Sequence, residues 1–591
     1  MKLLVPYVDR LESEDARLID LAEFLGIGCE TVHLGGAASQ DHAGALESHV
    51  GGDFCLAVNP KVIAKWTGSA IPSRPDPLPW SRFPFLLLHA PRPDAFDASL
   101  ITQLSGGQFR GVRPIGAPGS YAVAEDSRVV CGPYAGVDFG PANPANDQVF
   151  QFGPAMLEGR SLITIGGDPF MAALRRNGSE ILFLGGAGIA DLNDEASERP
   201  TDEFSRFLPY AMSLRYIFGG QSWRPGPGHA CVIVDDPLLR SSYGFLNFNS
   251  LFGMMKESNF HTTIAFIPHN YRRSAPAIVR LFRENPARLS LCVHGNDHTG
   301  AELAAVDQAL LHSMLQIAER RIAAHEQKTG LACPRVMVFP QGNFSREAMS
   351  VLQARNFDCA VNTGPYARDS ATARLTLGEV AQPALLRYSG FPLFLRARSS
   401  DITRQDLAFN LFFGRPVFLV EHHDGFKNPA PLLDAVSRIN SVDSAICWTN
   451  VGEATANSLW RRTSNHEQHL RAYCRTVRIA NDSDGAARFL LEWTRPPGGA
   501  VIEAVLLDGE SSGSFDSNGQ GVTVAVEMAP RASRTLSLLY PQVSMALPGL
   551  GARRTIRALV RRRLSEIRDN YLSRNELALT VAQKIRRSLL G

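Results

Sequence analysis

The chain has 591 residues, of which 45% are hydrophobic and 20% charged, and its net charge is +2. At roughly 100–200 residues per domain, this length predicts three or four domains. The near-neutral charge gives the molecule as a whole no strong preference for a polyanionic partner, so we expect no nucleic-acid partner. Its nine cysteines are scattered and form no CxxC motif, which excludes a disulfide framework or a zinc ribbon.

The N-terminal stretch "MKLLVPYVDRLESED" lacks the apolar core of about 7–15 residues and the cleavage site of a secretory signal. No window of the sequence approaches the roughly 20 apolar residues of a membrane span. We therefore expect a cytoplasmic protein.

Residues 1–225 are expected to form an open α/β domain. "DARLIDLAEFLGIG" has apolar residues at helical spacing and a glycine stop, and it predicts a helix. Continuous apolar runs are typical of parallel strands covered on both faces, and they occur in "FCLAVN", "FPFLLLHA", "SLITIGG" and "EILFLGG". "FLGGAGIAD" lacks the last glycine of a dinucleotide-binding motif, because Asp191 stands there.

Residues 226–460 follow a Gly/Pro-rich joint, "GGQSWRPGPG", and alternate short apolar strands with helical stretches. This β/α rhythm predicts a parallel barrel, whose chemistry lies at the carboxyl ends of its strands. The seven expected strands are "ACVIVDD", "TTIAFIP", "LSLCVHG", "RVMVFPQG", "DCAVNT", "PVFLVEHH" and "SAICWTN".

Two further segments complete the chain. Residues 465–541 contain short strands separated by Gly, Ser, Asn and Asp turns, which predicts a β-sandwich. Residues 552–591 form a basic helical tail with eleven Lys/Arg and three Asp/Glu. Its interspersed leucines favour docking on the protein or peripheral membrane contact over nucleic-acid binding.

Polar residues gather at the ends of the expected barrel strands. The first strand ends in "VIVDDP", and the like charges of Asp235 and Asp236 need a cation or a proton to relieve them. Strand alternation aims these neighbours in different directions, so that they can serve different roles. "VFPQG" contains Pro340 and Gly342, which predict a tight turn.

The stretch "VHGNDHTG" supplies His294 and His298. If a helix begins after Gly295, these residues share one face, with about 5–6 Å between their Cβ atoms. One carboxylate and two histidines leave a position open for water, as in catalytic metal sites. A zincin is excluded, because Gly295 stands where HExxH requires glutamate.

A late strand ends in "VFLVEHHDGF", which contributes His422 and His423. A histidine at this position is suited to protonate a leaving amine across the site from a metal ion. The order DD, HxxxH, P-x-G and a late histidine resembles that of the NodB-like polysaccharide deacetylases, carbohydrate esterase family 4. The resemblance covers residues 228–450.

The resemblance implies a distorted (β/α)7 barrel and a divalent metal ion, expected to be Zn²⁺. It makes Asp235 the general base and either His422 or His423 the general acid, with strand alternation slightly favouring His422. The implied metal ligands are Asp236, His294 and His298. The expected reaction is hydrolysis of an N-acyl group, most simply acetyl, on a saccharide or amino sugar.

Three positions depart from the family pattern: Gly295 replaces a Ser or Thr, Gln341 replaces an aromatic residue, and Val338 replaces the arginine that orients the base. Arg272 or Arg273 is the expected substitute for that arginine. These departures keep two alternatives open. One is a non-catalytic saccharide-binding or assembly component of exopolysaccharide production, and the other is an amidohydrolase acting on a non-carbohydrate amide.

Overall fold

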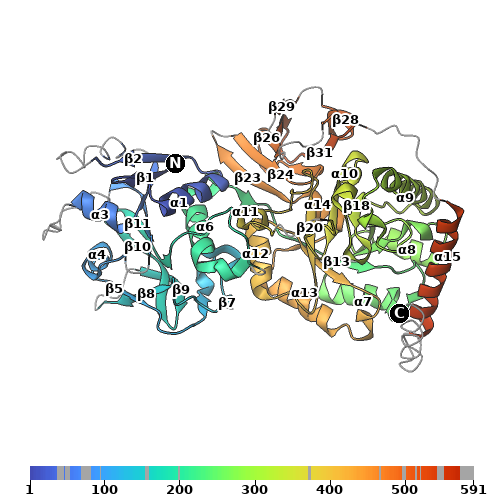
Figure 1. Cartoon of the computed structure of the whole chain (residues 1–591), viewed down its shortest axis with the longest axis horizontal. Helices are drawn as coiled ribbons and strands as arrows, with labels where there is room; N and C mark the ends of the chain where they lie inside the picture. The colour runs from blue at the N-terminus through green and yellow to red at the C-terminus, as the bar shows by residue number, and fades with distance from the viewer. Residues whose placement is uncertain are drawn as a thin grey trace. The chain divides into compact units, whose positions relative to one another are not determined.

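The computed structural model divides the chain into two compact units, which are described separately (Figure 1). Unit 1 comprises Met1–Arg224, Arg374–Ala381 and Arg461–His466, and unit 2 comprises Pro225–Ala373, Gln382–Trp460 and Glu467–Gly591. The structure describes residues 1–35, 46, 49, 53–67, 82–92, 95–153, 159–197, 200–369, 374–464, 467–494, 501–512, 515–518, 521–541 and 551–572. The expected division into four domains stays a prediction.

Unit 1 is built on a nine-stranded sheet in the order β2-β1-β3-β4-β11-β10-β9-β6-β7. Its parallel half comprises β2 (Cys29–His33), β1 (Lys2–Tyr7), β3 (Phe54–Val58), β4 (Phe85–Ala90) and β11 (Ser179–Ala187). The interiors of β1, β3 and β4 are buried, as expected for covered parallel strands. The expected N-terminal helix is α1 (Ser13–Phe24).

The other half of this sheet is antiparallel and contains β10 (Asp168–Arg176), β9 (Gly159–Ile165), β6 (Tyr121–Val123) and β7 (Asp138–Phe139). The run "SLITIGG", expected to be a parallel strand, lies in the antiparallel β9–β10 hairpin. Gly166 and Gly167 both have positive φ, 60° and 89°, and this is the backbone that a tight hairpin turn needs. The apolar run alone therefore did not reveal the strand direction.

Unit 2 contains a closed barrel of seven parallel strands, which confirms the barrel expected from the resemblance to NodB-like deacetylases. Because β13 pairs with both β16 and β21, the ring has no free edge. Around the ring lie β13 (His229–Asp235), β16 (Thr262–Phe266), β17 (Leu289–His294), β18 (Val336–Val338), β19 (Cys359–Asn362), β20 (Leu393–Arg398) and β21 (Val417–Glu421).

One of the seven expected strands lies outside the closed ring. "SAICWTN" contributes only the two-residue β22 (Cys447–Trp448), which pairs with β13 alone. The missing member of the ring is β20, whose sequence LFLRAR contains two arginines and was not recognised as a strand. Helices lie between the strands, among them α7 (Phe248–Ser258), α8 (Pro276–Glu284), α9 (Gln308–Thr329), α10 (Arg346–Ala354), α12 (Arg404–Phe413) and α13 (Ala430–Val442) (Figure 1).

The rest of unit 2 consists of two small sheets and a helix. One sheet contains β24 (Glu467–Ala472), β26 (Ala487–Thr494), β30 (Gly521–Met528) and β29 (Asp516–Asn518). The other contains β25 (Thr476–Ala480), β31 (Ser533–Leu539), β27 (Ala504–Leu507) and β28 (Glu510–Ser511). In β30 every second side chain from Val522 to Met528 is buried, the alternation that a sandwich requires.

Helix α15 (Ala552–Ile567) continues into a π-helical turn at Arg568–Leu572, and the remainder of the basic tail, 573–591, lies outside the described residues. Among the helices that the structure describes, none combines the length and apolarity needed to cross a bilayer.

Candidate metal centre

The carboxyl end of β13 places two carboxylates with different surroundings. Asp235 is the last residue of the strand and is 3% exposed. Asp236 follows with φ of 77°, a left-handed conformation that aspartate tolerates better than most residues. The backbone therefore leaves the strand between the two residues, and each side chain has its own partners.

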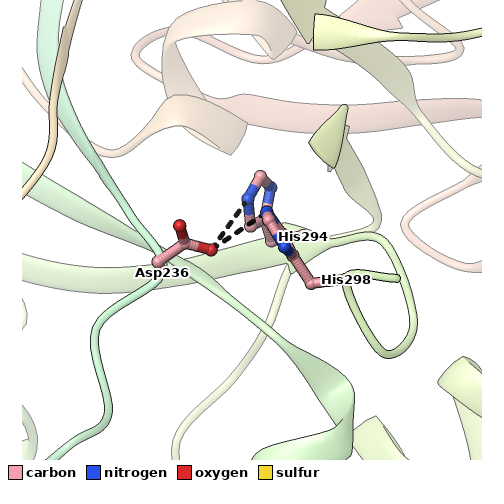
Figure 2. A group of neighbouring side chains, drawn as sticks. All are labelled: Asp236, His294 and His298. Carbon is pink, nitrogen blue, oxygen red and sulfur yellow. Dashed lines mark ion pairs between the residues drawn. The ribbon is translucent and has the colours of Figure 1, made fainter. Parts of the chain in front are cut away.

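Asp236 lies beside the two histidines of "VHGNDHTG" (Figure 2). Its Oδ1 atom is 3.4 Å from Nε2 of His294 and 3.2 Å from Nε2 of His298. One potential ligand atom from each of the three residues lies within 4.8 Å of the others. The three side chains thus form a group that can hold a metal ion, with two nitrogen donors and one oxygen donor.

Two observations fit a metal ion at this position. The Nδ1 atom of His294 lies 2.9 Å from the carbonyl oxygen of Val338, to which a protonated Nδ1 donates. Nε2 is then unprotonated and faces Asp236, as a metal ligand requires. Asp236 Oδ1 is buried and accepts no hydrogen bond from any described residue, so a cation would satisfy an otherwise costly atom.

The histidines are brought together by a loop. No helix begins after Gly295, so the condition of a shared helix face is not met: His294 ends β17, and residues 295–300 are irregular, with φ of 61° at Gly295 and 58° at His298. The buried Glu302 carboxylate anchors this loop by accepting hydrogen bonds from the backbone N–H groups of Asn296 and His298, at 2.8 and 3.0 Å. The Glu302 carboxylate thus provides the hydrogen-bond acceptor that these buried backbone N–H groups need.

The pKa values of the three side chains reflect their burial and mutual contact. Burial opposes ionisation of Asp236, but His294 and His298 outweigh it and hold the pKa of Asp236 well below its usual range. Burial lowers the pKa of His298 to about 4, so its imidazole is neutral near pH 7. For His294 burial acts in the same direction, but the adjacent Asp235 and Asp236 carboxylates raise its pKa.

Asp235 forms a buried bidentate ion pair with Arg396 of β20. The two Nη–Oδ distances are both 2.7 Å, and both side chains are 4% exposed. Burial alone would raise the pKa of Asp235, but the Arg396 guanidinium lowers it, so the carboxylate is ionised and able to accept a proton. The expectation that Arg272 or Arg273 takes this position is wrong, because Arg273 pairs with Glu566 of α15.

The two late histidines have different surroundings. His422 is 54% exposed, and its Nε2 lies 3.8 Å from Oδ2 of Asp235. His423 is 13% exposed, and its Nε2 lies 3.5 Å from Oδ1 of Asp569 in the turn after α15. Asp569 also accepts a 2.7 Å hydrogen bond from the hydroxyl of Tyr243. His422 is thus the histidine near Asp235, whereas His423 is held by the C-terminal segment.

A cavity of about 780 Å³ lies at this end of the barrel. Its lining includes Asp236, both late histidines, Arg568 and Asp569. Sequence reasoning missed Arg396, Glu302 and Asp569. Only Arg396 had a local signal, because the short apolar run "FPLFL" directly before it is typical of a strand.

A scan against protein-family models matches none of them, and a search of curated proteins returns no relative. Among solved structures, the chain is similar to Agd3, described as a novel carbohydrate deacetylase, with 9% identity and a TM-score of 0.45, covering 92% of this chain and 99% of that one.

The barrel region is also similar to a family 4 carbohydrate esterase from Streptomyces lividans in complex with acetate, with 16% identity and a TM-score of 0.23, covering 38% and 92% of the two chains. A family 4 acetyl xylan esterase from Clostridium thermocellum in complex with a cobalt ion gives 14% identity and a TM-score of 0.24, covering 38% and 89%. At identities of 9–16% and TM-scores below 0.5, these similarities assign no activity to this chain.

Proposed function

We propose that the chain is a metal-dependent hydrolase that removes N-acyl groups, most simply acetyl, from a saccharide. One observation carries the proposal: the Asp236, His294 and His298 group lies next to a second, buried carboxylate that Arg396 keeps ionised. Metal-assisted hydrolysis needs these two functions side by side, a cation site and a proton acceptor for the attacking water. Zn²⁺ suits the two nitrogen donors and one oxygen donor.

The residues of the site have separate roles in this proposal. A divalent ion, when bound, supplies Lewis-acid activation of the acyl carbonyl and of water. Asp235 takes the proton of the water that attacks the carbonyl carbon, and Arg396 fixes the direction of its carboxylate. His422 donates a proton to the departing amine, since its exposed ring lies near Asp235 at the cavity. The products are a free amine and a carboxylate.

The polar cavity supports a saccharide as the substrate class. Its volume of about 780 Å³ is in the range of small-molecule sites, and its lining combines charged groups with Phe245, Pro431 and Leu432. Such a lining offers hydrogen bonds to hydroxyl groups and apolar contact to the face of a sugar ring. A cytoplasmic location remains a prediction from the sequence.

The test measures bound zinc and acetate release from N-acetylated oligosaccharides by the full chain. We expect Asp235→Asn to retain zinc and lose acetate release, and His294→Ala to lose both. His33→Ala, on an exposed histidine of unit 1, is the control and should behave as wild type. His422→Ala and His423→Ala compare the two candidate acids, and we expect the larger loss of turnover from His422→Ala.

Retention of zinc by His294→Ala would overturn the metal site. Tight zinc binding without turnover of any amide would favour the non-catalytic saccharide-binding role. Turnover of simple amides but of no N-acetylated saccharide would favour an amidohydrolase on a non-carbohydrate substrate.

A further inference from the structure

Helix α15 has its polar side buried and its apolar side exposed, the reverse of an ordinary surface helix. Its buried side, continued into the following turn, comprises Ala558, Arg562, Glu566 and Asp569, each at most 8% exposed. Its opposite side, the outer face, exposes Ile556, Leu559, Val560, Leu564 and Ile567 by 49–62%. These five large apolar side chains form a stripe on one helix face, interrupted only by the exposed Arg563 between Leu559 and Ile567, and such a stripe marks an interaction site.

Contacts with the barrel fix this orientation. Glu566 forms a bidentate ion pair with Arg273, and Asp569 accepts a hydrogen bond from Tyr243. The backbone N–H of Gly244 donates a 2.9 Å hydrogen bond to Oδ1 of Asn570. Rotating the apolar stripe inward would break all three contacts and leave buried charges unpaired, so the stripe stays outward.

The charges around the stripe are positive. Residues 551–572 contain seven arginines and two carboxylates, and both carboxylates, Glu566 and Asp569, lie on the buried side in ion pairs. Arg557, Arg561 and Arg568 fall along one border of the stripe at helical spacing. A shallow hollow of about 450 Å³ lies on this face between the first two arginines and the side chains of Ile556, Val560 and Leu564.

We propose that the outer face of α15 docks in the plane of an anionic lipid membrane. The apolar side chains would enter the boundary between headgroups and acyl chains, and the bordering arginines would contact lipid phosphates. A helix of 16 residues spans roughly 24 Å and lies along the surface rather than crossing it. Docking would hold the cavity, which Arg568 and Asp569 line, beside the membrane.

The charges argue against two other occupants. In a two-fold contact with a second copy, the same face meets itself, which would bring the arginines of both helices together. A nucleic acid would satisfy the arginines but would leave the aliphatic stripe against phosphates and water. An anionic bilayer satisfies both the stripe and its cationic border, and this inference does not depend on the proposed hydrolase activity.

The test is co-sedimentation of the full chain with phosphatidylcholine vesicles that either contain or lack phosphatidylglycerol. We expect binding only with phosphatidylglycerol, weakened by salt. Leu564→Asp should lower the affinity by at least about tenfold, because it places a charge in the stripe. Arg557→Glu should lower it by about fivefold or more. The matched control is Val501→Asp, which changes a valine 72% exposed in the sandwich and should leave binding unchanged.

No binding to phosphatidylglycerol vesicles by wild type would overturn the proposal, as would equal losses in Leu564→Asp and Val501→Asp. Reversible dimerisation of wild type, abolished by Leu564→Asp and accompanied by no vesicle binding, would assign the face to a second copy. Thermal unfolding and zinc content of each variant are measured in parallel. A loss of vesicle binding with unchanged zinc content separates this surface from the candidate metal centre.

Discussion

Asp235 is a buried carboxylate whose negative charge is matched by Arg396 through two 2.7 Å contacts. A pair of this kind contributes little net stability compared with apolar residues, but removal of one partner leaves an uncompensated buried charge. The arginine also keeps the carboxylate ionised. Arg396 is therefore a positioning residue for Asp235 in the proposed reaction.

Arg396→Gln is expected to lower the free energy of unfolding by about 3 kcal/mol, as measured by urea denaturation. Without the guanidinium the pKa of Asp235 rises, so the acidic limb of the pH–rate profile for acetate release should move to higher pH. The double variant Asp235→Asn/Arg396→Gln should recover much of the lost stability. Equal stability of Arg396→Gln and wild type would contradict the pairing.

Gly295 shapes the turn between the two histidines. Its φ is 61°, and a Cβ atom there would lie 2.2 Å from Oε1 of Glu302 and 2.4 Å from Cγ of Pro340. A side chain at this position must therefore displace the residue that anchors the loop.

Gly295→Ala is expected to weaken zinc affinity by about tenfold or more, measured by competition with a chelator, because His298 moves relative to His294. Gly253→Ala is the matched control, since a Cβ atom at that position of α7 meets open space. Unchanged zinc affinity in Gly295→Ala would show that the loop accommodates the side chain.

At the scale of elements, α9 places a buried histidine against the barrel. His325 is fully buried, its ring centroid is 4.5 Å from that of Phe266, and its Nε2 lies 2.9 Å from the hydroxyl of Ser274. Burial lowers the pKa of His325 to about 4. Between that value and the ordinary value of 6.5, the unfolded chain binds the proton and the folded chain does not.

The stability of unit 2 should therefore fall as the pH drops from about 6.5 towards 4, by up to about 1.4 kcal/mol per pH unit from this histidine. His325→Phe keeps an aromatic ring beside Phe266 and removes the titrating group, so its unfolding free energy should depend less steeply on pH in that window. Urea titrations at several pH values measure both slopes. Identical slopes would assign the pH dependence to other groups.

At the scale of the whole molecule, the segment formed by α15 and the turn after it is held by residues much earlier in the chain. Its contacts join Glu566, Asp569 and Asn570 to barrel residues 293 to 326 positions earlier in the chain. The Arg273–Glu566 pair has side chains 18% and 11% exposed, so it is screened less than a surface pair.

A double-mutant cycle of Arg273→Met and Glu566→Gln should give a coupling energy of about 1 kcal/mol or more. Hydrogen exchange of the α15 amides should become faster in each single variant, because the helix loses a link to the barrel. Arg534→Met breaks an exposed pair with Asp508 in the sandwich and should leave α15 exchange unchanged. A coupling energy near zero would mean that other contacts hold the helix.

Several features could be predicted from local sequence. The apolar runs predicted six of the seven barrel strands. Because these runs end where the strands end, they also placed several site residues at or just beyond strand ends: Asp235, Asp236, His294, His422 and His423. The strand β20 was not predicted, because its two arginines interrupt the apolar pattern. One of these arginines, Arg396, pairs with the carboxylate of Asp235, 161 residues earlier in the chain. No local sequence pattern indicates a contact over that separation.

The sequence by itself determined the β/α rhythm, the pair of acidic residues and the spacing of the two histidines, because apolar periodicity and strand ends are local properties. Only the tertiary structure decided that Arg396 meets Asp235, that Glu302 holds the histidine loop and that α15 buries its polar side. Each of these depends on which strands and helices become neighbours when the barrel closes. An amphipathic pattern shows that a helix has two faces, but the residues that contact it, here Tyr243 and Arg273, decide which face is buried.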